Sequence, residues 1–222
     1  MSKRIVAVCM SLLFISIAAY CESPDPNNWY WAIIAGSSFQ NSDTWGGVGV
    51  ASGATDGYDL PGNDWQIVLG SKAYLGTYHT NGSGGWTGQT GFYASDTRAP
   101  LPLQPGLSKT WVIYVWADPR VPADASYIAF RWDDYHALPS ELSFTMTLKA
   151  KPVGVAGGPA LGTVWDLSSQ PHGSAFLPVF RTANGLEGYV FDFTATVIPE
   201  PSTLAALLAG LAGFGAVIRR RR

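Results

Sequence analysis

Alternating apolar and polar positions mark two strands in the second half of the chain. Within "LSFTMTLKA" the side chains of Phe144, Met146 and Leu148 share one face, and within "GYVFDFTATV" those of Phe191 and Phe193 do the same. A period of two places successive side chains on opposite faces of a strand. The pattern predicts two half-buried strands with these five residues in the core.

The remaining central region indicates further short strands separated by turns. Residues 109–118 are apolar on both faces, which predicts a central strand. Gly- and Pro-rich stretches such as "NGSGG" and "LPLQPG" divide the segments. We expect an all-β fold, an antiparallel β-sandwich of jelly-roll type, with a closed barrel as the alternative. Additional candidate strands are 29–36, 65–70, 126–132 and 162–167.

The chain ends on an apolar run followed by arginines. Residues 204–218 carry no charge, and Arg219, Arg220, Arg221 and Arg222 follow at once. A helix of this length reaches across a thin bilayer, and the arginines favour the cytoplasmic side. The sequence therefore predicts a C-terminal transmembrane helix, preceded by a segment that two prolines keep extended.

The N-terminus has the composition of a secretory signal. "MSKR" is basic, residues 5–17 are apolar, and "SIAAYCES" supplies small residues for cleavage. We expect a helical signal peptide at residues 1–21, read by the Sec export machinery. A lipoprotein at Cys21 is the weaker reading because bulky Tyr20 precedes it, and an apolar core of thirteen residues is short for a lasting membrane helix.

Removing both ends changes the charge of the protein. Residues 22–201 contain eight basic and sixteen acidic side chains, a net charge of −8, whereas the whole chain carries −2. An acidic body disfavours nucleic acid as a partner. Cleavage after Cys21 would also remove both cysteines, so no disulfide is expected and the core must stabilise the body.

Pro199, Glu200 and Pro201, followed by the apolar helix and the arginine cluster, resemble the PEP-CTERM sorting signal of Gram-negative bacteria. The resemblance implies recognition of these residues by exosortase, an inner-membrane-anchored precursor, and delivery to the cell surface or extracellular matrix. It also implies an association with exopolysaccharide and biofilms. The expected organisation is a signal peptide at 1–21, a β-domain at 22–198 and a sorting signal at 199–222.

Two stretches of the body are similar to exported bacterial β-sandwich modules of unknown activity. They are "GVGVASGATDGYDLPGND" and "AFRWDDYHALPSELSFTMTLKA". The resemblance brings no catalytic residue, and the sequence contains no nucleophile elbow, zinc-binding helix motif or phosphate loop. We therefore expect a non-catalytic protein; the alternative is a secreted polysaccharide-processing enzyme with the same sorting tail, which would need two facing carboxylates.

One acidic loop has the composition of a calcium site. "TDGYDLPGND" places Asp56, Asp59 and Asp64 close together, with Asn63 and two glycines between them. Calcium prefers six to eight oxygen ligands of this kind, although Asp, Asn and Gly also form ordinary turns. Calcium binding and a solvated turn both remain open, and no other cofactor is expected.

The sequence has nine tryptophans, all within the body. Trp111, Trp116 and Trp132 lie in apolar strands and should fill the core. Trp86 lies in a Gly-rich segment, where we expect it to form, with Tyr78 and Tyr93, an exposed patch that stacks on carbohydrate.

Overall fold

The body of the chain folds as one β-sheet in the computed structural model, which describes residues 24–36, 44–59, 64–67, 72–82, 85–121, 126–134 and 138–199. The predicted signal peptide and the predicted membrane-spanning segment lie outside these residues. Within the described ranges, no helix is long and apolar enough to cross a membrane. The predicted all-β class of the body is confirmed.

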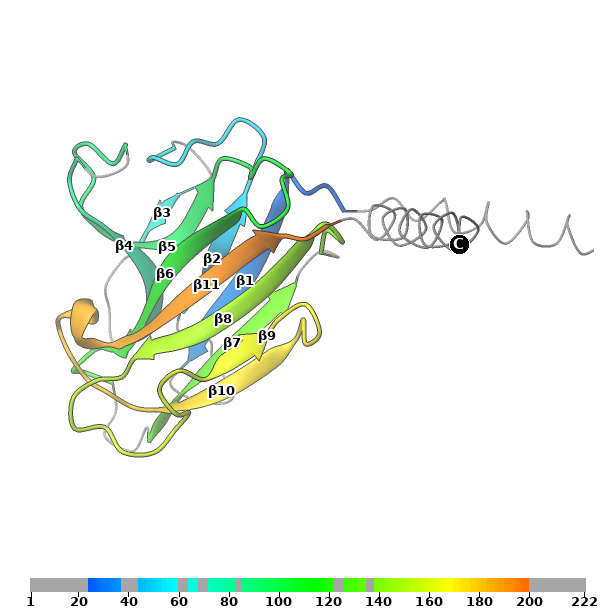
Figure 1. Cartoon of the computed structure of the whole chain (residues 1–222). Coiled ribbons are helices and arrows are strands. Elements are labelled where there is room, and N and C mark those ends of the chain that lie inside the picture. Colours follow the sequence, from blue (N-terminus) through cyan, green and yellow to red (C-terminus); the bar gives the residue numbers. More distant parts are fainter. Residues whose placement is uncertain are drawn as a thin grey trace, which may run out of the picture.

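Eleven strands make up the sheet (Figure 1). They are hydrogen-bonded in the order β10-β7-β1-β2-β5-β4-β6-β11-β8-β9, and β3 pairs with β5 outside this path. The bounds are β1 Trp29–Gly36, β2 Thr44–Val50, β3 Trp65–Gln66, β4 Ala73–His79, β5 Gly91–Arg98, β6 Ser108–Ala117, β7 Tyr127–Asp134, β8 Leu142–Ala150, β9 Val164–Asp166, β10 Gly173–Pro178 and β11 Tyr189–Val197, with a short 3-10 helix, η1, at Gly185–Glu187.

The sheet curls until its two edges approach each other. Strands β9 and β10 lie at opposite ends of the strand order, yet only residues 167–172 separate them in the chain. Trp132 on β7 lies 5.9 Å from the ring of Trp165 on β9, and its indole N–H donates to the carbonyl of Gln170 at 3.2 Å. Side chains and a short link therefore bring the edges together.

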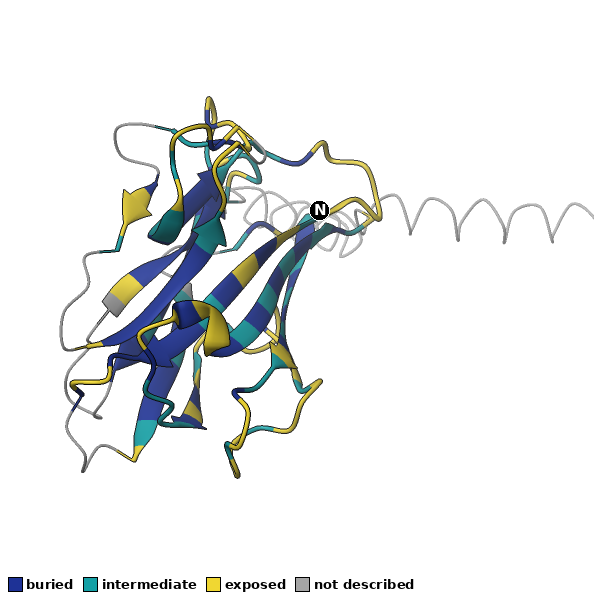
Figure 2. Ribbon diagram, turned by 90° about the vertical axis from the view of Figure 1, so that its left-hand side faces the viewer, coloured by how far each residue is buried: buried dark blue, intermediate teal, exposed yellow. Residues whose placement is uncertain are grey.

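An aromatic core fills the inside of the curl, and buried residues follow the strands in Figure 2. The Trp29 ring centroid on β1 lies 4.9 Å from that of Phe144 on β8, in an edge-to-face arrangement. Trp31 lies 5.8 Å from Phe193 on β11. Such pairs add to the free energy gained by removing apolar area from water. Strand β1 is thereby fixed against β8 and β11, although it is bonded to neither.

The predicted core residues are buried. Phe144, Met146, Leu148, Phe191 and Phe193 have no exposed surface, which confirms the period-two reading of β8 and β11. The three tryptophans assigned to the core are buried as well: Trp111, Trp116 and Trp132.

The strand pairing departs from the purely antiparallel arrangement that we expected. Strands β2 and β5 pair in parallel, with Gly47 opposite Ser95 and Val50 opposite Arg98. A parallel pair needs a long crossover, and residues 51–90, which include β3 and β4, supply it. The halves of this single curled open sheet face each other as sandwich layers do.

Both ends of the described body leave from the same end of the molecule (Figure 1). Strand β11 is held on both sides up to its last residue, because Val197 N–H donates to Leu107 at 2.8 Å and Ile198 N–H donates to Glu141 at 2.9 Å. Pro199 follows directly. The sorting segment therefore begins where the sheet ends, without an intervening linker.

Truncation of a core ring should test the packing. We expect Phe193→Ala to lower the free energy of unfolding by about 3–5 kcal/mol, because the cavity would open among several aromatic rings. Val153→Ala is the control, since Val153 is 96% exposed, and it should change stability by less than about 0.5 kcal/mol. Denaturant unfolding measures both; equal losses would contradict the assigned core.

Candidate functional site

A cleft on the outer face of the sheet presents the exposed tryptophans of the body. It has a volume of about 310 Å³ and lies where β1, β2, β3 and β5 meet. Trp45 and Trp65 line it and are 47% and 59% exposed, whereas six other tryptophans are buried. Its other described lining residues are Asn28, Trp29, Tyr30, Gly46, Val50, Ala51, Ala94, Ser95 and Thr97.

The sequence of β2 explains how the ring of Tyr30, one of the lining residues, lies close against the sheet. Val48 and Val50 face the core, while Gly47 and Gly49 lie on the outer face opposite Ala32 and Tyr30. A Cβ on Gly47 would lie 2.0 Å from the Trp31 carbonyl oxygen and 2.9 Å from the Tyr30 ring. Only glycine fits this close approach. A strand with valines inside and glycines outside therefore leaves room on the outer face for the Tyr30 ring.

The polar groups of the cleft are uncharged. Tyr30 Oη lies 3.4 Å from Ser95 Oγ, and burial raises the pKa of the Tyr30 hydroxyl above its ordinary value. The described lining residues include no Asp, Glu, Lys or Arg. The Tyr30 ring lies 6.2 Å from that of Trp45. The cleft thus offers aromatic faces and neutral hydrogen-bonding groups to a ligand.

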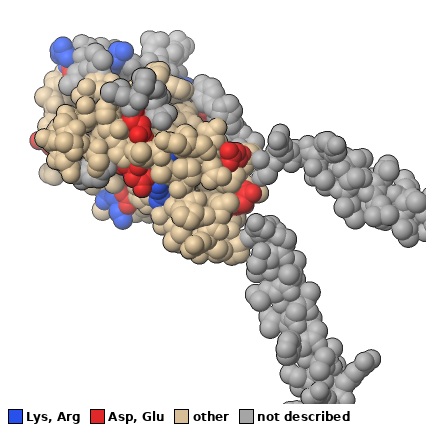
Figure 3. All heavy atoms as spheres, turned by 90° about the horizontal axis from the view of Figure 1, so that it is seen from above, with Lys and Arg blue, Asp and Glu red and all other residues tan. Residues whose placement is uncertain are grey.

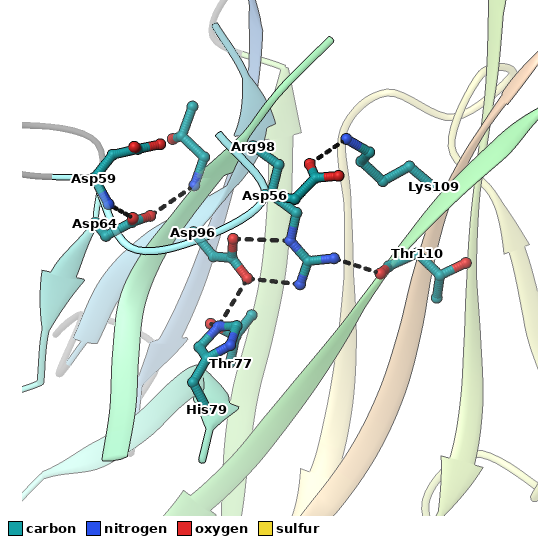
Figure 4. Close-up of polar contacts among 10 residues, drawn as sticks. Asp56, Asp59, Asp64, Thr77, His79, Asp96, Arg98, Lys109 and Thr110 are labelled. Carbon is teal, nitrogen blue, oxygen red and sulfur yellow. Dashed lines mark hydrogen bonds and ion pairs between the residues drawn. The ribbon is translucent and has the colours of Figure 1, made fainter. Parts of the chain in front are cut away.

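A buried ion-pair cluster lies across β4 and β5, and Figure 4 shows Asp96 between His79 and Arg98. The Asp96 side chain is fully buried and receives two bonds from the Arg98 guanidinium, at 3.0 and 2.9 Å. His79 Nε2 lies 3.0 Å from the same carboxylate. Burial alone would raise the pKa of Asp96, but the contacts with His79 and Arg98 outweigh it and hold that pKa below its usual value.

The surroundings of this cluster favour a structural role. Trp86 stacks on His79 with ring centroids 3.4 Å apart, and Arg98 lies over the ring of Trp111 at 5.2 Å. His79 directs the same nitrogen to Asp96 and to Thr77 Oγ1, so the histidine does not relay a proton between the two. Sequence reasoning missed the cluster because His79 and Asp96 lie far apart in the chain.

The stacking patch predicted from sequence is not an exposed surface. Trp86 is 2% exposed and Tyr93 is fully buried, because Tyr58 and His79 cover them. Tyr78 lies apart from them and contacts Phe92 at 4.9 Å. The Gly-rich composition around Trp86 suggested a loop with little core nearby; the flanking strands β4 and β5 supply that core. The exposed indoles lie instead in the outer-face cleft.

Each of the three predicted calcium ligands already has a partner within the protein. Figure 4 shows the contact of Asp56 with Lys109 and that of Asp64 with the Asp59 N–H. Asp56 pairs with Lys109 at 2.5 Å, and Asp59 accepts a hydrogen bond from the Thr55 N–H at 2.6 Å. Asp64 accepts from the backbone N–H groups of Asp59 and Thr97. In the part of the chain that the structure describes, no three acidic, histidine or cysteine residues form a group that could hold a metal ion.

Two adjacent carboxylates, Asp133 and Asp134, stand at the end of β7 and are not among the lining residues of the cleft. Asp133 contacts His172 at 2.8 Å in an exposed position. The side chain of Asp134 lies outside the described residues. Over the face in Figure 3, most described side chains are neither acidic nor basic. Of the predicted sorting residues, only Pro199 is described, two residues after the end of β11.

Comparison with known proteins identifies the C-terminal segment. A family model described as the PEP-CTERM protein-sorting motif matches residues 197–222. No curated protein and no solved structure matches the chain significantly. The sorting signal predicted from the proline-glutamate-proline step is thereby confirmed, and the match begins at the last residue of β11.

Removing the cation that pairs with buried Asp96 should be costly. We expect Arg98→Ala to lower the free energy of unfolding by about 3–5 kcal/mol, because it leaves a buried carboxylate without its main partner. Arg120→Ala is a matched control: Arg120 holds Asp118 in the same two-bonded arrangement, also two residues apart, but is 64% exposed. Arg120→Ala should lower the free energy of unfolding much less than Arg98→Ala does. Comparable decreases in denaturant unfolding would contradict the claim that burial makes the Arg98–Asp96 pair important for stability.

The buried Asp64 should impose a pH dependence. Burial raises the pKa of Asp64 to about 6, against about 3.9 in an unfolded chain. Between these values the folded protein binds a proton that the unfolded chain has released, so this contribution to stability falls as pH rises from about 4 to about 6. Relative to wild type, Asp64→Asn should therefore become more stable across that window. Denaturant unfolding at several pH values tests this, and a constant difference would contradict it.

Proposed function

Because the chain ends in a PEP-CTERM protein-sorting motif, we propose that it is an exported, exosortase-processed protein of the cell surface or extracellular matrix. In this proposal the β-body catalyses no reaction and is associated with exopolysaccharide. The observation that carries the proposal is the motif at residues 197–222, joined without a linker to the last strand of the folded body. The motif implies an exported precursor that is anchored in the membrane before processing.

The end of β11 suits presentation of the motif to a processing enzyme. Backbone hydrogen bonds hold Val197 and Ile198 in the sheet, so Pro199 continues an extended chain. In the proposal the Sec machinery exports the chain, and the apolar segment with Arg219 to Arg222 holds the precursor in the inner membrane. Exosortase then binds the segment around Glu200. A folded body directly beside the membrane would leave only this short stretch accessible.

Two observations support a body without catalytic activity. The described lining of the outer-face cleft has no ionisable acid or base other than Tyr30, whose pKa is raised. The most polar buried group, Asp96 with His79 and Arg98, is enclosed by aromatic rings. A polysaccharide-processing enzyme, the alternative, would need two carboxylates facing each other across such a cleft.

Substitution of the motif's acidic residue should separate sorting from anchoring. We expect Glu200→Ala to leave export and membrane insertion intact but to block processing, because a charge read by the enzyme is lost. The unprocessed precursor should accumulate in the inner membrane of the native host, as detected by fractionation and immunoblotting. Replacing Arg219 to Arg222 with serine should instead weaken retention and orientation of the tail.

A carboxylate outside the motif provides the control. Glu141 lies beside the exit of the tail, where its carbonyl accepts from Ile198, and Glu141→Ala should mature normally. A strain lacking exosortase should accumulate the wild-type precursor. Normal maturation of Glu200→Ala, or a wild-type chain that keeps its tail in both strains, would show that the segment is a plain anchor.

A further inference from the structure

We propose that the outer-face cleft is a binding site for a neutral carbohydrate, with the indoles of Trp45 and Trp65 as stacking platforms. The site is independent of the sorting signal, because all of its described lining residues belong to the β-body. Three features of the cleft support this assignment: the exposure of the two rings, its shape and its lack of charge.

The exposure of the two indoles is unusual for this protein. Its core buries six of nine tryptophans, and Trp165 is half-buried against Trp132 and Phe191. Trp45 and Trp65, which lie on separate strands with β5 between them, are nevertheless exposed at one cleft. Leaving two large apolar rings in water forgoes free energy that burial would supply. Convergence of exposed apolar rings is typical of a ligand-binding surface.

Tyr30 and Trp45 contribute aromatic rings to the cleft. Because Gly47 and Gly49 carry no side chains, the Tyr30 ring lies close against β2, 6.2 Å from the ring of Trp45. Both rings line the cleft. Its volume of about 310 Å³ lies at the lower end of the range for small-molecule sites. A cleft of this volume suits a few sugar units of an oligosaccharide rather than a folded protein.

The polar groups of the cleft indicate which class of ligand it can bind. Pyranose rings combine apolar C–H faces, which lie flat on an indole, with hydroxyl groups at their edges. Ser95 and Thr97 lie side by side on the outer face of β5, opposite Trp65 and Gly49, and Asn28 and Tyr30 add further polar groups. These side chains match hydroxyls and offer no counter-charge to a carboxylate or sulfate.

The net charge of the body also favours a neutral ligand over an anionic one. Its net charge of −8 between residues 22 and 201 would repel an anionic polysaccharide at ordinary ionic strength. A neutral glycan avoids this repulsion, so a neutral oligosaccharide should bind more tightly than an acidic one of equal length.

Titration with defined oligosaccharides tests the proposal. The full-length chain, purified in a detergent without a sugar headgroup, is titrated calorimetrically with cellohexaose, laminarihexaose, maltohexaose and mannohexaose, and with a hexamer of galacturonic acid as the anionic probe. We expect at least one neutral probe to bind and the anionic probe to bind more weakly. Trp45→Ala and Trp65→Ala should each weaken the binding of that neutral probe by about tenfold or more.

Matched variants separate the cleft from general effects on folding. Phe176 on β10 is an exposed aromatic residue outside the cleft, at 42% exposure, and Phe176→Ala should leave affinity unchanged. Trp45→Phe and Trp65→Phe keep a ring and should retain part of the binding. If an alanine variant does not fold, protection of wild-type tryptophans from oxidation by N-bromosuccinimide in the presence of the neutral probe provides the readout.

Three results would overturn the proposal: no binding of any neutral probe, preference for the galacturonic acid hexamer, or neutral binding that survives both tryptophan substitutions. None of these results would affect the sorting signal, which is assayed by processing of the tail. Failure of the sorting experiment would likewise not bear on carbohydrate binding at the cleft. The sorting proposal and the cleft proposal are therefore tested separately.

Discussion

Burial of the aromatic core between the two halves of one sheet is the constraint on which the structure depends. Trp29 and Trp31 on β1 contact Phe144 and Phe193, which lie on strands several places away in the hydrogen-bonding order. These contacts form only if the sheet curls, and the predicted absence of disulfides in the mature body leaves the core to stabilise that curl. The same curl brings the edge strands β9 and β10 close enough for a six-residue link, 167–172.

The outer face of the sheet at β2 is determined by the side chains that β2 turns toward the core. Because β2 turns its valines toward the core, its glycines lie outward, and the ring of Tyr30 packs against them beside the cleft. The curl also places the start of β1 and the end of β11 at one end of the body, where the sorting segment begins (Figure 1). The cleft and the described start of the sorting segment, residues 197–199, therefore belong to the same folded body, although neither depends chemically on the other.

The sequence predicted those features that depend on short-range pattern. The period of two placed Phe144 and Phe193 in the core, and the order of prolines, apolar residues and arginines identified the sorting signal. Features that depend on pairing between distant strands were not predictable in this way. Trp86 was assigned to a surface patch because its neighbours in sequence are glycines, whereas its neighbours in space are His79 and Tyr93.

The cleft and the ion-pair cluster were missed for the same reason. The parallel pairing of β2 with β5 brings Gly47 beside Ser95, and no local motif indicates that register. One signal was present: "TWGGVGV" alternates valine with glycine, which predicts a strand whose outer face another group approaches closely. A period-two search for glycine, and not only for apolar residues, would have indicated this close approach but not the cleft beside it.

The central claim is that the protein buries most of its tryptophans and keeps Trp45 and Trp65 for a neutral glycan. Indole NMR tests it most directly, because each of the nine tryptophans gives one ring N–H signal. On addition of the neutral oligosaccharide that binds, the account predicts shifts at the tryptophans that line the cleft, largest at the exposed Trp45 and Trp65, with the signals of buried Trp31 and Trp111 unchanged. Shifts at the buried rings without shifts at Trp45 and Trp65, or no shifts at all, would contradict it.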